Sequence, residues 1–281
     1  MQLGIDISIW QGNMDFAKAV ESGAKFCIIR SGAVSKSGYP YEDYKFRSNY
    51  KNAIKYFDTL GTYWFFRPEH SVTSQASFMV SLLKDVNFKG EVFLDVEYNA
   101  KGIGKETFRN KIHKFMDILK VYGYKDLGIY TRGIFWNSNI GSGDFSNYKL
   151  WIARYTTRNH PWNDNPKLFK PLGWNTWHYW QFSADGNSRG KEFGAESNDI
   201  DLNYKNTPKH ECQKYRVVAN RLKIRNGPGT NYRQVGILDK DTVVTAIDTA
   251  YDFNNNLWAN IGYKQWCAIN YNSTTLMIKE S

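Results

Sequence analysis

In the first 205 residues of this chain, short apolar runs alternate with longer amphipathic stretches. The apolar runs have the length and composition of β-strands, and they cover residues 3–8, 24–31, 60–66, 90–97, 127–131, 149–155, 178–183 and 200–203. Apolar residues at helical spacing mark helices at 41–57, 71–86 and 104–123. Strands that alternate with helices pair in parallel, so the pattern predicts an α/β barrel or a doubly wound sheet. Beyond about residue 127 little helix separates the strands, and we therefore expect an irregular, TIM-like (β/α) barrel.

The composition changes at the polar, proline-containing stretch NTPKHECQKY, residues 206–215. After it come short alternating strands with a Gly-Pro-Gly turn and no helical period. This pattern is typical of a small β-barrel. We therefore expect a large domain at 1–207, a linker at 208–214 and a second, smaller all-β domain at 215–281.

Several classes of site and segment are absent from the sequence. No apolar run approaches the roughly 18 residues of a membrane span, so membrane insertion is not expected. The N-terminus MQLGIDISIWQG has no basic region followed by an apolar stretch, so no signal peptide is expected. The cysteines and histidines form no CxxC, CxxxH, HExxH or HxH pattern, and neither a metal site nor an organic cofactor is expected. Cys27, inside the apolar run KFCIIR, should be a buried free thiol.

The net charge of +10 is spread over both parts of the chain rather than gathered in a tail. A spread excess of positive charge suits a polyanionic surface, such as a cell wall that carries teichoic acids, as well as it suits nucleic acid. Solubility alone would explain it equally well, so the charge does not choose a partner.

Acidic residues lie in several of the expected strands. Asp95 and Glu97 are one Val apart in EVFLDVEYN, and they point to the same side because strand side chains alternate between faces. Asp6 lies in LGIDIS, and Asp199 and Asp201 lie in SNDIDLN. The C-terminal ends of barrel strands converge on one pocket, so acids from different strands would form one cluster there. Clustered acids separate their pKa values, which yields the acid and the anion that glycoside hydrolysis needs.

The sequence resembles the family 25 glycoside hydrolases in six blocks, which are GIDISIWQG, VFLDVEYN, LGIYT with a following FW, LWIARY, HYWQFS and DIDLN. This family contains the N-acetylmuramidases, or lysozymes, of bacterial autolysins and phage endolysins. The resemblance covers residues 3 to about 204. The tail, with LKIRNGPGTNY, LDKDTVV and LWANI, resembles a bacterial SH3-like wall-binding domain.

The resemblance implies a role for each acid. Glu97 matches the family's catalytic acid in its D-x-E motif, and Asp95 matches the residue that orients or stabilises the reacting sugar. Asp6 and Asp201 match two further acids that line such pockets. Asp199 is the weaker candidate for the last position, because the DLN context fits Asp201 better.

Aromatic and polar residues in the same blocks are expected to bind the sugar. Aromatic rings stack on the C–H faces of a sugar ring, and the candidates are Tyr63, Phe65, Tyr130, Trp136, Tyr155 and Trp180. Gln181 offers a donor and an acceptor. Arg67 would pair with a substrate carboxylate, such as the muramic lactyl group, or serve in a structural ion pair. Where family members often read Y-H-F/Y, this chain has Trp64 at the His position, so the contact of that His is in doubt.

These features predict a peptidoglycan hydrolase that cleaves the β-1,4 bond between N-acetylmuramic acid and N-acetylglucosamine. Glu97 would protonate the leaving oxygen. Sequence spacing does not give the separation of the carboxyl groups, so retention and inversion stay open at this point. The resemblance favours retention, with assistance from the substrate acetamido group as an option. The implied partner is bacterial peptidoglycan, bound by the large domain through its glycan and by the tail through a wall component, and not nucleic acid.

Other interpretations were weighed against this one. A wall-binding protein on a degenerate barrel would not need all four acids. A chitinase-like barrel would carry the pattern D-x-x-D-x-D-x-E, which is absent, and a cysteine peptidase or amidase would need a motif around Cys27. The missing signal peptide fits a phage endolysin that is made in the host cytoplasm and reaches the wall after holin-type release; a bacterial lysin stored inside the cell is the competing source.

Overall fold

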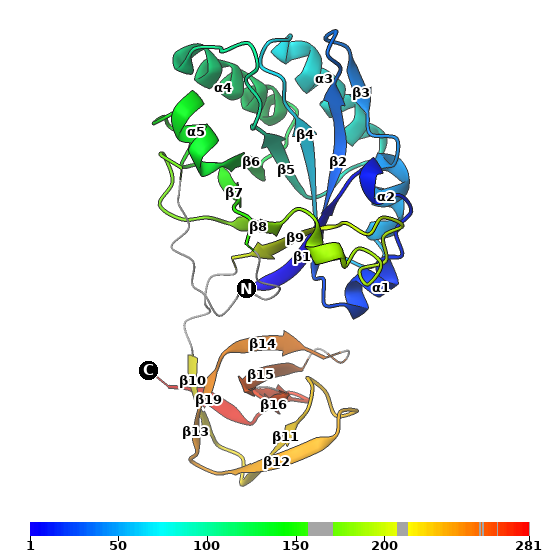
Figure 1. Cartoon of the computed structure of the whole chain (residues 1–281). Helices are drawn as coiled ribbons and strands as arrows, with labels where there is room; N and C mark the ends of the chain where they lie inside the picture. Colours follow the sequence, from blue (N-terminus) through cyan, green and yellow to red (C-terminus); the bar gives the residue numbers. More distant parts are fainter. Residues whose placement is uncertain (157–170, 207–212, 253, 255, 263, 281) are drawn as a thin grey trace. The chain divides into compact units, whose positions relative to one another are not determined.

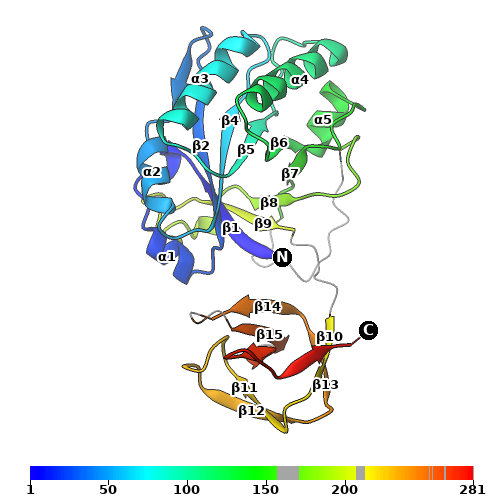
Figure 2. The same ribbon diagram turned by 180° about the vertical axis from the view of Figure 1, so that it is seen from behind.

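The computed structural model describes residues 1–156, 171–206, 213–252, 254, 256–262 and 264–280. The chain divides into two compact units, Met1–Asn206 and Thr207–Ser281. Figures 1 and 2 show the elements of each unit from opposite sides. The first strand of the second unit begins at Gln213, inside the expected linker 208–214; residues 208–212 of that linker lie outside the described residues.

Eight strands of the first unit close into a barrel (Figure 1). In the order of their hydrogen bonding they are β1 (Gln2–Ile7), β2 (Phe26–Val34), β4 (Thr59–Phe65), β5 (Glu91–Asp95), β6 (Leu127–Arg132), β7 (Lys149–Ala153), β8 (Tyr179–Ser183) and β9 (Asp201–Lys205). Neighbouring strands run in parallel except β9, which is antiparallel to both β8 and β1. The short strand β3 (Pro40–Glu42) pairs with the end of β2. The expected strands are therefore present, in a mixed rather than an all-parallel barrel.

The helices of the first unit follow the early strands. They are α1 (Phe16–Glu21), α2 (Phe46–Ala53), α3 (Val72–Asp85), α4 (Lys105–Val121) and α5 (Gly133–Asn139), with 3-10 turns at Ile9–Gln11 and Gly186–Ser188. The three helices expected from apolar spacing correspond to α2, α3 and α4, whereas the short α1 and α5 were not expected. The apolar stripe of α4 is fully buried, as its spacing predicts, and consists of Phe108, Ile112, Phe115, Met116 and Leu119.

The barrel wall separates two apolar layers, because alternate side chains of each strand point inward and outward. On β5, Val92 and Leu94 point outward and join the large core that the helices cover. Phe93 points inward and belongs to a second cluster with Phe26, Ile28, Tyr130, Trp151, Ala153 and Tyr179. The barrel interior is thus filled with aromatic rings, and polar side chains of the inward faces are left at its ends. Cys27 is a buried free thiol, as expected.

The second unit is built of strands alone in its described part, as the tail pattern predicts. Its strands are β10 (Gln213–Val217), β11 (Arg221–Arg225), β12 (Gln234–Asp239), β13 (Val243–Ala246), β14 (Asp248–Tyr251), β15 (Leu257–Gly262), β16 (Gln265–Ala268), β17 (Asn270–Tyr271), β18 (Thr274–Thr275) and β19 (Met277–Lys279). They form a three-stranded sheet, a five-stranded sheet and a two-stranded hairpin. Val217, Cys267 and Met277 lie at the centre of a small apolar core. Across the described residues of both units, no helix has the length and apolar character needed to span a membrane.

Candidate active site

Seven strands of the barrel contribute side chains to one cavity of about 210 Å³. It lies at the end of the barrel where the parallel strands finish, and its lining consists of Asp6, Tyr63, Asp95, Glu97, Tyr130, Trp151, Tyr155, Gln181, Ala184 and Asp201. All four acids predicted from the sequence are therefore in one place. The exposed Asp199 does not line the cavity, so the position of Asp201 agrees with the preferred alternative.

Asp95 and Glu97 reach the cavity because the chain continues in extended form past β5. The amide of Val96 donates to the carbonyl oxygen of Tyr130 over 2.9 Å, and the Thr131 hydroxyl donates to the Val96 carbonyl oxygen over 2.7 Å. These bonds hold the segment against β6, while the Val96 side chain is buried in the outer core. The two flanking carboxyl groups consequently point to the cavity side, as strand alternation predicts.

Asp95 is buried, and no ion pair among the described residues includes it. Its side chain is 5% exposed, and its Oδ1 has no hydrogen-bond partner among the described residues. Burial raises the pKa of Asp95 well above its usual value, and the charges of Glu97 and Asp6 raise it further. Glu91, on the same inward face of β5, is different: it lies 3.2 Å from Lys149 Nζ and 3.1 Å from Lys205 Nζ. Glu91 is thus paired with lysines, whereas the surroundings of Asp95 favour its protonated form and raise its pKa.

Asp6 and Asp201 face each other across the antiparallel pair of β1 and β9. Asp6 Oδ2 accepts hydrogen bonds of 2.8 Å from Gln181 Nε2 and from Asn203 Nδ2. Burial raises the pKa of Asp6 to about 6, although these donors oppose the change. Burial and the charge of Asp6 raise the pKa of Asp201 well above its usual value, and the two carboxyl groups are hydrogen-bonded to each other. Such a bond needs one proton, which Asp201 holds when Asp6 is ionised.

Glu97 is the least enclosed of the four acids, with a side chain that is 22% exposed. Burial raises the pKa of Glu97, and the guanidinium of Arg132 lowers it. Arg132 Nε lies 3.2 Å from Glu97 Oε2, and the arginine side chain is 53% exposed. Glu97 is thus placed between the buried acids and the opening of the cavity, where a bond of a bound substrate can reach it.

Gln181 links the predicted tyrosines to the acids. The hydroxyl groups of Tyr130 and Tyr155 donate to Gln181 Oε1 over 2.7 Å and 3.2 Å, and the amide of Gln181 donates to Asp6. This network fixes which end of the Gln181 amide faces each neighbour. Tyr63, the fourth predicted binding residue at the cavity, packs edge-on against Trp151 at 5.8 Å between ring centroids.

Phe65 is the last residue of β4 and Arg67 lies two residues beyond it; neither lines the cavity. The Arg67 guanidinium lies 4.4 Å from the ring centroid of Tyr98 and 5.8 Å from that of Phe65. Its Nη1 is 3.5 Å from Glu69 Oε1, which corresponds to the structural ion pair considered as the alternative. The two residues form a half-buried cluster beside the cavity.

Trp136 and Trp180 correct the sequence-based prediction, because neither reaches the cavity. Trp136 is fully buried outside the barrel on α5, where its Nε1 donates to the carbonyl oxygens of Gly141 and Leu172. Trp180 precedes Gln181 on β8, so an inward Gln181 requires an outward Trp180. Its ring is 2% exposed in the outer core, and its Nε1 donates to the Arg154 carbonyl oxygen. Both tryptophans are packing residues.

Several residues of the site were missed from the sequence. Trp151 lines the cavity and donates through Nε1 to Asn203 Oδ1 over 2.8 Å, and Asn203 in turn holds Asp6. Strand alternation carries a signal for both, since Trp151 shares a face with Tyr155 and Asn203 shares one with Asp201. Ala184 and Arg132 carry no such signal, because each lies at a strand end whose direction is set by the barrel.

The four acids are not arranged as a metal site. In the described part of the chain, no group of three or more His, Cys, Asp or Glu side chains has the geometry to hold a metal ion. The Asp6 and Asp201 carboxyl groups are instead hydrogen-bonded to each other, as paired acids are in acid–base catalysis.

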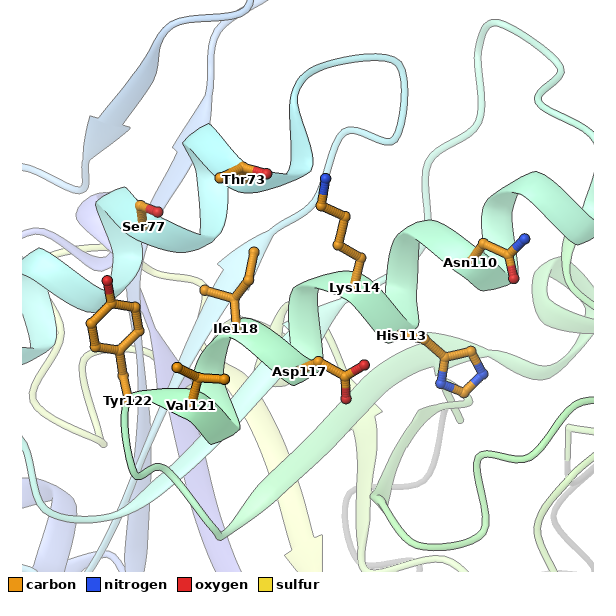
Figure 3. A pocket seen from close by; sticks show the side chains of 9 residues that line it. All are labelled: Thr73, Ser77, Asn110, His113, Lys114, Asp117, Ile118, Val121 and Tyr122. Carbon is orange, nitrogen blue, oxygen red and sulfur yellow. The ribbon is translucent and has the colours of Figure 1, made fainter.

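A second hollow, of about 530 Å³, lies between α3 and α4 on the outside of the first unit (Figure 3). Thr73 and Ser77 of α3 face the side chains of α4 across it. Its one carboxylate, Asp117, lies 3.1 Å from Lys120 Nζ. Without a second acid this hollow lacks the paired carboxyl groups of glycoside hydrolysis, and the barrel cavity remains the candidate active site.

Comparison with known proteins identifies the family of the chain. The model of the family described as glycosyl hydrolases family 25 matches residues 5–191. Lysozyme M1 from Streptomyces globisporus is 31% identical over 212 residues, which are 71% of this chain and 66% of that protein. The chain spans 44% to 66% of the length of three curated relatives that it matches.

Solved structures share the fold of the first unit. The bacterial lysozyme from Streptomyces coelicolor is 28% identical with a TM-score of 0.59, and the match covers 73% of this chain and 92% of that one. The modular autolysin LytC from Streptococcus pneumoniae, solved with a synthetic peptidoglycan ligand, is 22% identical with a TM-score of 0.56. That match covers 72% of this chain and 46% of LytC, and it shows the fold alone.

Proposed function

This chain belongs to glycosyl hydrolases family 25, and we propose that it is a peptidoglycan hydrolase of the muramidase type. Its substrate would be the β-1,4 bond between N-acetylmuramic acid and N-acetylglucosamine. The name of its relative Lysozyme M1, which is 31% identical, supports this substrate class. The observation that carries the proposal is the cavity itself, where four carboxyl groups from three parts of the barrel meet beside tyrosine rings.

Glu97 is the proposed general acid. Of the four acids it is nearest to the opening, and burial raises its pKa, as a proton donor at neutral pH requires. Its proton would pass to the glycosidic oxygen as the bond to the anomeric carbon breaks. The ionised Asp6 would add a negative charge to the cavity, and this charge favours the positive charge that develops on the sugar.

Asp95 is proposed to orient the substrate acetamido group, in a retaining reaction that the acetamido oxygen assists. Its carboxyl is buried, burial raises its pKa, and one of its oxygens has no partner among the described residues. A protonated carboxyl both donates and accepts, so it can hydrogen-bond an amide N–H or C=O of the sugar. The amide oxygen would attack the anomeric carbon, and water would later open the resulting ring with the stereochemistry retained.

The second unit is proposed to bind the wall, and an SH3-like fold fits its small antiparallel sheets. Ten of the chain's basic residues and six of its acidic ones lie in 209–281, so this part has a net charge of +4. A positive surface favours an anionic polymer. The alternative, a wall-binding protein without activity, is separated from a hydrolase by the experiment below.

The test replaces Glu97 by Gln and measures new reducing ends on purified peptidoglycan. Borohydride reduction should convert the ends made by the unsubstituted protein to muramitol. Gln keeps the shape of Glu but cannot donate the catalytic proton, so the rate should fall by at least about 100-fold. Asp199→Asn, at an exposed acid outside the cavity, is the matched control and should retain the rate.

Three results would count against the proposal. Glucosaminitol as the sole reduced sugar would make the protein a glucosaminidase. Glu97→Gln at the full rate would remove Glu97 from the acid role. No reducing ends at all from the unsubstituted protein would favour the wall-binding alternative.

A further inference from the structure

A larger hollow adjoins the catalytic cavity. It has a volume of about 740 Å³ and is formed by residues 132–135, at the end of β6 and the start of α5, and by residues 152–155, at the end of β7. Tyr155 lines both spaces, so the hollow begins where the cavity ends. Its surface combines apolar side chains, among them the exposed Ile134, with the guanidinium groups of Arg132 and Arg154.

Arg132 lies at the border between the two spaces. It lines the hollow, yet its Nε is 3.2 Å from Glu97 Oε2 in the cavity. Its guanidinium lies 5.6 Å from the ring centroid of Tyr155. The side chain is 53% exposed, and among the described residues its other neighbours are the tyrosines Tyr130 and Tyr155.

The contact between Arg132 and Glu97 opposes the proposed chemistry. A general acid must carry a proton, whereas a guanidinium beside a carboxyl favours the ionised form. The Arg132 charge does lower the pKa of Glu97, against the effect of burial. The pair therefore describes a resting arrangement, and a bound substrate has to change it.

We propose that the hollow binds a carboxylate-bearing substituent of the glycan, and that this carboxylate takes Arg132 away from Glu97. The inference rests on the proposed function and adds a specificity-determining residue to it. An apolar surface with two arginines suits an acid on a short apolar arm, and a carboxylate–guanidinium pair can form with two hydrogen bonds. Peptidoglycan offers such a group in two places, the lactyl carboxylate of a bare muramic acid and the carboxylates of an attached peptide.

The exchange couples binding to catalysis. The substrate carboxylate replaces the Glu97 carboxylate at Arg132, so the number of ion pairs is unchanged. The carboxyl groups of Asp6, Asp95 and Asp201 then face Glu97, and the ionised Asp6 among them disfavours a negative charge on Glu97. Glu97 takes up a proton from solvent and becomes competent as the acid. Tyr130 and Tyr155, the other titratable neighbours of Glu97, are uncharged at neutral pH because burial raises the pKa of both.

The experiment compares three glycans of equal length. One carries its peptides, one has been stripped by an amidase and has free lactyl carboxylates, and one has been stripped and then coupled to methylamine. The third has no carboxylate. One charge-assisted hydrogen bond corresponds to roughly 10- to 100-fold in kcat/KM, so the protein should prefer a carboxylate-bearing glycan over the methylamide by this factor.

Arg132→Gln should bring this preference close to one, and Arg132→Lys, which keeps the charge, should retain part of it. Arg47→Gln is the matched control. Arg47 lies on α2, is 48% exposed and is paired with Glu42 and Asp85, and its replacement should leave the preference intact. If Arg132→Gln loses only the preference for the peptide-bearing glycan over the methylamide, the peptide is the source of the carboxylate. If it loses only the preference for the stripped glycan over the methylamide, the lactyl group is the source.

Two results overturn the inference, and they are distinct. Equal kcat/KM on all three glycans, or a preference that Arg132→Gln leaves unchanged, refutes the inference and leaves the hydrolase assignment standing. Failure of the unsubstituted protein to cleave any of the three refutes the proposed function and the inference with it.

Discussion

Replacing Asp6 by Asn should stabilise the folded protein at neutral pH, even though it removes a carboxyl group from the candidate active site. The Asn oxygen can accept the hydrogen bonds that Gln181 Nε2 and Asn203 Nδ2 now donate to Asp6 Oδ2. The Asn amide can donate to a carboxyl oxygen of Asp201, which keeps its proton because burial raises its pKa. The substitution therefore keeps the local hydrogen bonds and removes a buried negative charge.

The pKa of Asp6 sets the size of this effect. Asp6 is 2% exposed, and burial raises its pKa from 3.8 to about 6. Because the folded-state pKa is above the unfolded one, the folded protein binds the proton more tightly, and stability is lost as the pH rises from about 4 to about 6. One pKa unit corresponds to about 1.4 kcal/mol. Ionised Asp6 thus lowers the free energy of unfolding by about 3 kcal/mol at pH 8, and Asp6→Asn should recover an amount of this order.

Urea unfolding at a series of pH values measures the difference. Tryptophan fluorescence reports mainly on the first unit, because Trp258 and Trp266 are the only two of the 10 tryptophans beyond residue 206. The gain of Asp6→Asn over the unsubstituted protein should be near zero at pH 4 and grow to its full value by pH 8. Asp199→Asn, an exposed acid with the same charge change, should show no such growth. A gain that is the same at every pH, or a loss at pH 8, would refute the assignment of Asp6 as an acid destabilised by burial.

Two further predictions concern the neighbours of the acids. Arg132→Gln should shift the basic limb of the pH profile of kcat/KM to higher pH. The Arg132 charge lowers the pKa of Glu97, and Glu97 must stay protonated to act as the acid. A basic limb at the same pH in both proteins would contradict this prediction. Trp151→Phe should lower the free energy of unfolding by about 1–3 kcal/mol, since Asn203 Oδ1 would be buried without its donor, and urea midpoints at pH 7 measure this.

Strand alternation explains how much of the site the sequence could predict. It places Asp95 and Glu97 on one side of β5 and Val96 on the other, which the structure shows. The same rule, applied strictly, would have excluded Trp180 once Gln181 was chosen. The family resemblance pointed to the right blocks, but a block contains inward and outward residues, and only the two-residue period separates them. Trp136 could not be excluded in this way, because it lies on α5, where packing against Phe145 and Trp174 decides its direction.

Contacts between different strands could not be predicted from either pattern. Arg132, the last residue of β6, meets Glu97 because β5 and β6 are neighbours in the barrel and the chain continues past β5 to Glu97. No spacing in the sequence encodes that distance. The proposed exchange at Arg132, the least expected feature of the site, therefore depends on tertiary structure alone.

The direction of β9 shows how a prediction can reach the right residue on an incomplete premise. Asp201 was expected in the pocket because strand ends converge in a parallel barrel, yet it is the first residue of β9. In a parallel strand the first residue lies at the opposite end from Asp95. Asp201 reaches the cavity because β9 runs antiparallel, which brings its start beside the end of β1 and pairs it with Asp6. The reversal also makes the shared proton of Asp6 and Asp201 possible, so the mixed barrel is itself a requirement of the acid cluster.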